Sequence, residues 1–407
     1  MNSYLNKKKI DAYMPKNYRL ILLFNANKAY DRQVIEGIGN YLDKYHCDWD
    51  LLMEEDFTYC AKQLDSMVCD GIIADMDDDN IRTLVSQVDV PIVGVGSSFN
   101  DPNDYPEVPY VATDNQDLLK SAFNHLKDKG IENFAFYGLA NNCDKPWAKE
   151  RELAFKQVVD KLGYKKNIIQ GIESSVINWQ YDINRLADWL QSLPIPTGII
   201  AVTDSRARYL IQACEQNNIL VPEQIAIVGI DNEEVVRFLS KIPLSSVEQG
   251  CLEMGYQAAK LMHESLLQPE LLKKRTSLPR IVVPANKVHE RQSSEYVSLN
   301  DPFVIQAMHF IKRNACKGIK VEQVLDHIGI SRSNLDTRFR EERGHSIHHE
   351  IHQEKLKYAC ELLCDINISI QSVADRSGYP SLQYMYSVFK KDLGYTPKEF
   401  RVKKSCC

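Results

Sequence analysis

The strongest constraint on the fold is a change of pattern near residue 290. Between Tyr18 and about Val283, short apolar runs alternate with amphipathic segments, whereas residues 301–401 contain helical patterns and no strand-like run. Continuous apolar runs are typical of strands buried on both faces of a parallel sheet, so the first pattern predicts α/β units and the second an all-α domain. A chain of 407 residues also exceeds one ordinary core, so we expect two or three domains.

Six strand candidates and six helix candidates support this division. The strand candidates are bounded by Asp, Gly or Pro and cover residues 19–24, 71–74, 91–95, 133–137, 197–202 and 226–229. The helix candidates cover residues 32–42, 117–130, 150–162, 179–193, 205–217 and 255–267. Their alternation predicts doubly wound parallel sheets with ligand-binding loops at the carboxyl ends of the strands.

The polar stretch from His289 to Asn300 predicts a linker between the two parts. We therefore divide the chain into an extension (1–17), a sensor domain (18–288), a linker (289–301) and a helical domain (302–402). No apolar run approaches the ~20 residues of a membrane helix. The basic N-terminus lacks the apolar segment of a signal peptide, so we expect no membrane association and a cytoplasmic protein.

The helical domain contains two copies of one motif, about 40 residues apart. Each copy consists of a short helix, a tight turn and a second helix. Apolar stripes end at the turn residues Gly329 and Gly378, and Ser331 and Ser381 are good N-caps for the helices that follow. Two such units suit consecutive major grooves of DNA better than they suit catalysis. The alternative is a helical bundle with a solvated polar face.

Outward positions on the second helix of each pair are the candidate DNA contacts. They are Arg332, Ser333, Asn334, Thr337 and Arg338 in the first pair, and Leu382, Gln383, Tyr384, Ser387 and Lys390 in the second. Residues 301–407 carry 17 Lys and Arg against 13 Asp and Glu, while residues 1–300 carry 32 against 42. A basic helical domain behind an acidic sensor is the expected polarity for a DNA-binding protein.

Several other functions find no support in the sequence. There is no GxxxxGK[ST], GxSxG or GxGxxG motif, so an enzyme is not predicted. The 11 cysteines form no CxxC pair, so neither a zinc site nor a cofactor is expected. The acidic run from Asp75 to Asp79 is interpreted as a solvated loop rather than a metal site.

The helical domain resembles the AraC-type DNA-binding domain of bacterial transcription activators. The resemblance rests on Ile370-x-x-Val-Ala-x-x-x-Gly-Tyr379, on Phe389-Lys-Lys391 and on Gly394-Tyr-Thr-Pro-Lys-Glu-Phe-Arg401, with Met385 where a Phe is common. It implies a double-stranded DNA operator as partner. We expect a homodimer on this operator, with RNA polymerase as a further partner.

The sensor domain resembles the periplasmic-binding-protein-like effector domain of the LacI type, in which two α/β lobes close over a sugar. The segments Val111-Ala-Thr-Asp-Asn115, Ala226-Ile-Val-Gly-Ile-Asp-Asn232 and Leu244-Ser-Ser-Val-Glu-Gln249 carry this resemblance. It implies ligand contacts from Asp231, Gln249, Asp204, Arg151, Asn25, Asn27, Tyr30 and Asp31. Trp147 could stack on a sugar face, and Asp75 could supply a contact that the family places at the position of Gly96.

Each of these residues also has a plainer interpretation. Asp231 and Asp204 could cap loops, Trp147 could belong to the core, and Tyr30 and Asp31 could begin a helix. A sugar site does need many polar groups, because sugar hydroxyls cannot be buried unpaired.

The order of the two domains narrows the resemblance further. Leu22-Leu-Phe-Asn-Ala-Asn-Lys-Ala-Tyr-Asp-Arg-Gln-Val34 and Ala315-Cys-Lys-Gly-Ile-Lys-Val321 are similar to segments of the xylose-responsive activators of enteric bacteria. This similarity extends over residues 18–401. It implies D-xylose as effector and activation of genes for xylose catabolism and uptake.

Overall fold

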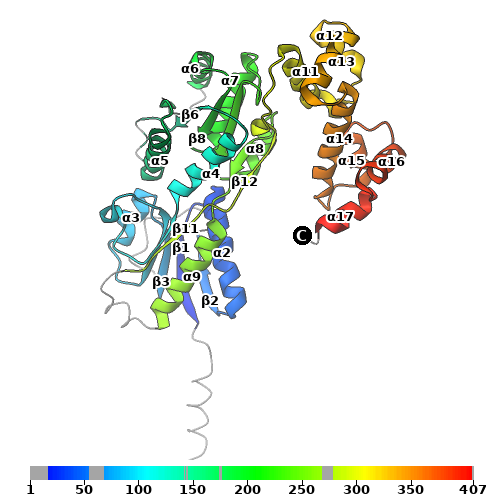
Figure 1. Ribbon diagram of the computed structural model, residues 1–407. Coiled ribbons are helices and arrows are strands. Elements are labelled where there is room, and N and C mark those ends of the chain that lie inside the picture. The colour runs from blue at the N-terminus through cyan, green and yellow to red at the C-terminus, as the bar shows by residue number, and fades with distance from the viewer. Residues whose placement is uncertain are drawn as a thin grey trace, which may run out of the picture. The chain divides into compact units, whose positions relative to one another are not determined.

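The protein consists of two compact units, Met1–Glu295 and Tyr296–Cys407. The computed structural model describes residues 17–54, 68–141, 143, 145–173, 177–267 and 278–405. The predicted extension lies outside the described residues except for Asn17. Figure 1 shows the sheets and helices of the first unit and the helices of the second.

Two six-stranded sheets, each the centre of one lobe, form the first unit. The sheet of lobe 1 has the order β11-β5-β4-β3-β1-β2, and all its neighbours are parallel. Its strands are β1 (Tyr18–Leu23), β2 (Trp49–Leu52), β3 (Gly71–Asp75), β4 (Ile92–Ser97), β5 (Tyr110–Thr113) and β11 (Arg280–Val283).

The sheet of lobe 2 has the order β12-β10-β9-β8-β6-β7 and is parallel except for β12, which pairs antiparallel with β10. Its strands are β6 (Asn133–Gly138), β7 (Asn167–Gln170), β8 (Thr197–Ala201), β9 (Ile225–Ile230), β10 (Ser245–Val247) and β12 (Val288–His289). The six predicted strands correspond to β1, β3, β4, β6, β8 and β9, so the predicted α/β class is confirmed.

Helices cover both faces of each sheet, which explains the continuous apolar runs. In β1, Leu20 and Leu22 pack with α2 (Ala29–Tyr45) and α9 (Cys251–Leu267). Ile21 and Leu23 point to the other face, where α3 (Asp79–Val85) lies.

In lobe 2, Ala135 and Tyr137 of β6 pack with α6 (Trp179–Ser192) and α7 (Asp204–Gln216). On the opposite face, Phe134 contacts Phe123 of α4 (Asn115–Asp128), with 4.3 Å between ring centroids. Helix α5 (Pro146–Leu162) completes this face, and the short α8 (Glu234–Leu239) follows β9.

The chain crosses between the two sheets after β5, after β10 and again after β11. Each lobe is therefore built from segments distant in sequence, and the carboxyl ends of the strands bring their loops to the junction between the lobes. Within the described ranges, no helix combines the length and apolar character that crossing a bilayer requires.

The first part of the predicted linker is packed into lobe 2. Residues 292–294 form a 3-10 helix in which Ser293 and Ser294 are buried. The Ser293 hydroxyl accepts the Ser245 N–H at 2.8 Å and donates to the Ile227 carbonyl at 2.6 Å. Polarity in this stretch serves hydrogen bonding to the sheet, and the boundary between the units falls after Glu295.

The second unit is helical throughout its regular structure and contains two cores joined by one long helix. Its α-helices are α11 (Pro302–Asn314), α12 (Val321–Ile328), α13 (Arg332–Arg343), α14 (Ile347–Leu363), α15 (Ile370–Arg376), α16 (Leu382–Leu393) and α17 (Pro397–Ser405). Ile347 and Ile351 of α14 belong to the core of α11–α13, whereas Leu356 and Leu363 belong to the core of α15–α17. Helix α14 thus fixes one helix pair relative to the other.

Candidate functional site

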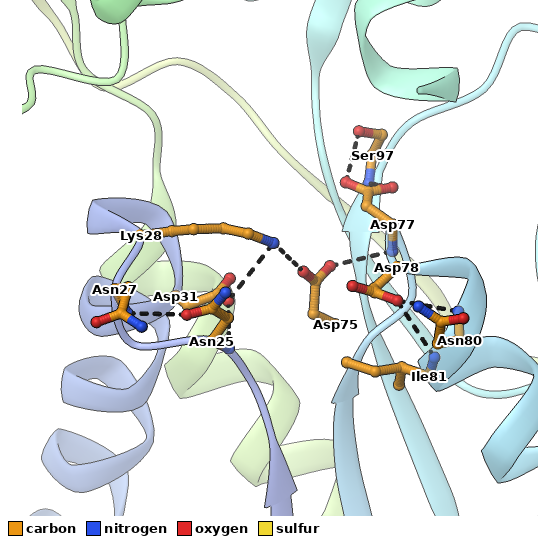
Figure 2. A network of polar contacts seen from close by, with 10 residues as sticks. All are labelled: Asn25, Asn27, Lys28, Asp31, Asp75, Asp77, Asp78, Asn80, Ile81 and Ser97. Carbon is orange, nitrogen blue, oxygen red and sulfur yellow. Dashed lines mark hydrogen bonds and ion pairs between the residues drawn. The ribbon is translucent and has the colours of Figure 1, made fainter. Parts of the chain in front are cut away.

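The loop after β1 and the end of β3 form a charged network in lobe 1, drawn in Figure 2. Lys28 Nζ lies 3.2 Å from Asp75 Oδ2 and 3.9 Å from Asp31 Oδ2. Asp31 also accepts the Asn25 N–H at 2.7 Å, and Asp75 accepts the Asp77 N–H at 3.0 Å. A single ammonium group therefore holds two buried carboxyl groups together.

This network is short of positive charge. Burial, together with the charge of the neighbouring Asp75, raises the pKa of Asp31 to about 8 and that of Asp77 to about 7. Burial opposes the charge on Lys28, but Asp75 and Asp31 outweigh it and raise the Lys28 pKa. Asp31 Oδ1 is buried and has no hydrogen-bond partner among the described residues. A ligand hydroxyl could supply the missing donor.

In lobe 2, the buried Arg151 gathers the polar groups at the ends of the strands. It donates to Asn115 Oδ1 at 3.1 Å and to the Val202 carbonyl at 2.8 Å, and its Nη1 lies 3.8 Å from Asp231 Oδ1. The guanidinium carbon lies 4.9 Å from the centroid of the half-buried Trp147 ring. The ring therefore stacks on the cation in this structure.

Asp231 and Gln249 form the hydrogen-bonded pair that the sequence placed in one site. Gln249 Nε2 donates to Asp231 Oδ1 at 2.7 Å, and Asp231 has a φ of 118°. Burial raises the Asp231 pKa to about 6, although Arg151 opposes the shift. Gln249 Oε1 is buried without a described hydrogen-bond partner, so it is an acceptor available for a hydroxyl.

Two predicted contacts are engaged within the protein. Asp204 is buried and accepts from the Ser246 hydroxyl at 2.6 Å and from the Glu233 N–H at 2.8 Å. Tyr30 packs against the core of lobe 1, with its hydroxyl 4.0 Å from Met254 Sδ. Asp204 holds the loop that carries Asp231 in place, and a direct ligand contact from either residue stays a prediction.

The loop after β1 contains the last two predicted positions. The Asn25 side-chain oxygen accepts the Asn27 N–H at 3.1 Å, which closes a local turn. Asn27 is exposed. This turn precedes Lys28 and so helps to place the ammonium group between the carboxyl groups.

The interpretation of residues 75–79 as a solvated loop is wrong. Asp75 is buried, Asp77 accepts from the Ser97 N–H and hydroxyl at 3.1 and 2.9 Å, and Asp78 caps α3. A Cβ at Gly96 would lie 2.3 Å from the Tyr110 hydroxyl and 3.0 Å from Asp77 Oδ1. The acidic run thus fills the place next to Gly96. The described residues contain no cluster suited to a metal ion.

Lys28, Asp77, Ser97 and Asn115 were missed by the sequence reasoning. Lys28 lies inside the loop already predicted from Asn25 to Asp31, so its position was the available signal. Asp77 and Ser97 share no spacing pattern, because they meet only when β3 and β4 pair in the sheet.

Two side-chain contacts bridge the lobes. Arg32 of α2 lies 3.3 Å from Glu233, which follows β9, and Asn100 after β4 donates to Glu150 of α5. A cavity of about 460 Å³ lies beside the first bridge, lined by Ala29, Arg32, Gln33, Glu36, Asn232, Glu233, Glu234 and Arg291. The lining includes none of the predicted ligand residues, although Ala29, Arg32 and Asn232 are their neighbours in sequence.

The second helix of each pair in the helical unit presents most of the predicted DNA contacts to solvent. Gly329 ends α12 with a φ of 76°, and Ser331 and Ser381 cap α13 and α16. Exposed side chains are Arg332, Ser333, Asn334, Thr337, Gln383, Tyr384, Ser387 and Lys390. The structure therefore leaves these eight available for a groove.

Arg338 and Leu382 differ from the other predicted contacts because both are half-buried. Arg338 donates to Asp301 Oδ2 at 2.5 Å, and Leu382 packs against the core of α15–α17. Among the exposed residues, Arg332 pairs with Glu322 and Lys390 with Glu399, both at 3.3 Å. These surface pairs are weak and would exchange readily for phosphate.

Comparisons with known proteins agree with this architecture. Residues 19–116 match the model of the XylR N-terminal domain, residues 123–294 match the periplasmic binding protein-like domain, and residues 324–403 match a helix-turn-helix domain.

Curated relatives match almost end to end. The xylose operon regulatory protein of Escherichia coli K12 is 55% identical over 386 residues, covering 95% of this chain and 97% of the relative. That of Haemophilus influenzae is 49% identical, covering 95% and 98%. A solved structure of the xylose-binding transcription activator XylR is 54% identical, covers 96% of this chain and 99% of its own, and superposes with a TM-score of 0.87. This chain belongs to the family of xylose operon regulatory proteins.

Proposed function

We propose that this protein binds D-xylose between the lobes of its first unit and activates genes for xylose catabolism and uptake. The observation that carries the proposal is the junction of the lobes, where polar groups from both sheets converge. Arg151 of lobe 2 donates to Asn115 Oδ1 at 3.1 Å, and the Asn115 N–H donates at 3.0 Å to the hydroxyl of Ser98, which follows β4 of lobe 1. Buried acceptors on Asp31 and Gln249 suit the hydroxyls of a sugar.

The choice of D-xylose rests on the names of the relatives, and calorimetry tests it. The purified chain is titrated with D-xylose, L-arabinose, D-ribose and D-glucose at one salt concentration. We expect measurable binding of D-xylose and weaker binding of the other three. If another sugar bound more tightly, that sugar would replace D-xylose as the proposed effector. The proposed location of the site would not change.

DNA binding is assigned to the second unit, with a homodimer on a double-stranded operator. The exposed faces of α13 and α16, fixed by α14, support this part of the proposal. Footprinting on a xylose promoter at matched protein and salt concentrations should show stronger protection with xylose. Equal protection with and without the sugar would contradict the ligand response. Sedimentation on the operator would test the dimer.

Two further parts of the proposal concern RNA polymerase and catalysis. Activation implies contact with RNA polymerase in the cytoplasm, where the promoter is. Transcription in vitro with purified polymerase should rise when protein and xylose are both present. We also propose that the protein has no catalytic activity toward the sugar, so incubation with xylose and ATP should return the sugar unchanged.

A further inference from the structure

The segment that leads from the first unit into the second is tied to the first recognition helix, α13. We define the lead-in segment as residues 297–301. Its Leu299 packs against the core that contains Leu335 and Phe339, the inward side chains of α13. Apolar packing therefore connects the lead-in segment to α13.

A second tie comes from the last turn of α13. Both carboxylate oxygens of Glu342 accept the Asn300 N–H, at 3.3 and 3.2 Å, and one of them accepts the Asp301 N–H at 3.2 Å. A carboxylate near a helix C-terminus is disfavoured by the helix dipole. Two donated N–H groups compensate for this, so Glu342 fits a role in holding the lead-in segment.

The third tie joins the end of the lead-in segment to the middle of α13. Asp301 Oδ1 caps α11 by accepting the Phe303 and Val304 N–H groups at 2.9 and 3.3 Å, while its Oδ2 accepts from Arg338. Burial opposes the charge on Asp301, but these bonds outweigh it and lower the Asp301 pKa. The capping carboxylate therefore remains ionised and paired.

The same arginine reaches a residue predicted to contact bases. Arg338 Nε donates to Asn334 Oδ1 at 2.6 Å, and its guanidinium lies 5.2 Å from the centroid of the Phe303 ring. Paired in this way, Arg338 has two of its five N–H donors engaged within the protein and fewer left for a DNA phosphate, and the Asn334 side-chain oxygen is already an acceptor. A displacement of the lead-in segment that separates Asp301 from Arg338 would therefore change the hydrogen bonding of both Arg338 and Asn334.

We propose that Asp301 and Glu342 form a tether through which the state of the sugar-binding unit reaches the DNA-reading face of α13. The chain between the units ends on this tether, so a change in the first unit alters the position or pairing of Arg338 and Asn334. This inference rests on the proposed xylose response, and it names the residues that connect the response to DNA.

The test measures the xylose-induced gain in DNA affinity in the full chain. Asp301→Asn keeps a good N-cap but removes the charge that holds Arg338. Glu342→Ala removes the side chain that accepts hydrogen bonds from the lead-in segment. Glu342→Gln keeps one side-chain oxygen as an acceptor. Glu341→Ala is the matched control, because it removes the same charge from an exposed neighbour on the same turn. Operator affinity with and without xylose and sugar affinity are measured for each.

Coupling between two sites is typically worth about 5–150-fold in affinity. We expect Asp301→Asn and Glu342→Ala to reduce the xylose-induced gain by about fivefold or more, with sugar affinity unchanged. Glu342→Gln should recover most of the gain, and Glu341→Ala should keep all of it. The tether is overturned if Asp301→Asn and Glu342→Ala keep the wild-type xylose-induced gain. It is also overturned if they lower DNA affinity by the same factor with and without xylose. A wild-type chain with no gain would overturn the proposed function, and the tether with it.

Discussion

Asp231 is the residue at which the predicted and observed sites agree best. It lies directly after β9, accepts from Gln249 and is 3.8 Å from Arg151. We expect Asp231→Asn to weaken xylose binding by about 10–100-fold, because a hydrogen bond to a charged group contributes about 1.5–3 kcal/mol. Sugar-free DNA affinity should stay nearly constant, and calorimetry with operator binding measures both.

The control for this variant is Asp188→Asn, which makes the same change at an exposed position on α6. It should leave both affinities as in the wild type. If Asp231→Asn abolished DNA binding without sugar, Asp231 would have a structural role rather than a ligand contact.

Asp31 makes the stability of the first unit depend on pH. Its ordinary pKa is 3.8 and burial raises it to about 8, so between these values the folded protein binds a proton that the unfolded chain lacks. Stability from this group is complete below about pH 4 and is lost as the pH rises through 8. We expect the free energy of unfolding to fall by roughly 1–3 kcal/mol between pH 6 and 8.

All four tryptophans lie in the first unit, so their fluorescence during urea unfolding follows that unit alone. Asp31→Asn removes the titrating group and should make the fall between pH 6 and 8 smaller. An equally steep fall in the variant would assign the pH dependence to other groups, such as Asp77.

At the scale of elements, the sequence predicted six of the eight interior strands and missed β5, β10 and all four edge strands. β3, β8 and β9 are wholly buried, and their apolar runs are unbroken. β2 and β7 are edge strands with no fully buried residue, so no apolar pattern marks them. β10 is buried but consists of Ser245, Ser246 and Val247, and its hydroxyls bond to residues 291–294 and to Asp204. Such pairings form only in the folded protein.

The two turn glycines of the helix pairs should differ in how much a methyl group costs. Gly329 and Gly378 have similar φ values of 76° and 69°. A Cβ at Gly329 meets nothing within 4 Å, whereas one at Gly378 would lie 2.4 Å from the Cys316 carbonyl oxygen. We expect Gly329→Ala to cost about 1–2 kcal/mol and Gly378→Ala about 2–5 kcal/mol.

Hydrogen exchange measures this difference locally, since amides of α12 and α13 report on Gly329 and those of α15 and α16 on Gly378. Equal losses in the two variants would mean that the segment around Cys316 moves aside freely.

Helix α16 should read bases through its first turn. Gln383 is exposed and lies two residues after the cap Ser381. Its side chain makes no hydrogen bond to another described residue that would compete with a base edge. We expect Gln383→Ala to weaken operator binding by about 5–150-fold and to relax the preference at one base pair. Xylose affinity should be unchanged. Lys390→Ala serves as the comparison, because losing a phosphate contact should weaken all sequences alike and lower the salt dependence.

The arrangement of the whole first unit could not be derived from periodicity. Alternating strands and helices would equally fit one continuous sheet, and the two lobes arise because the chain crosses after β5, β10 and β11. The resemblance to two-lobed sensors supplied that feature, together with Asp231, Gln249 and Arg151. Neither periodicity nor the resemblance predicted contacts between the lobes, such as Arg32 with Glu233, since these depend on how the folded lobes meet.

The Arg32–Glu233 bridge should favour the closed arrangement that holds a sugar. The Arg32 side chain is 46% exposed and that of Glu233 19%, so the pair is worth about 0.2–1 kcal/mol, or about 1.5–5-fold in xylose affinity. Arg32→Gln and Glu233→Gln each remove the charge pair, and Gln at 233 keeps an oxygen that can cap α8. Because both variants break one interaction, the double variant should bind xylose about as well as either single variant. High salt should reduce the wild-type affinity toward theirs. Strictly additive losses would show that the bridge does not couple the lobes.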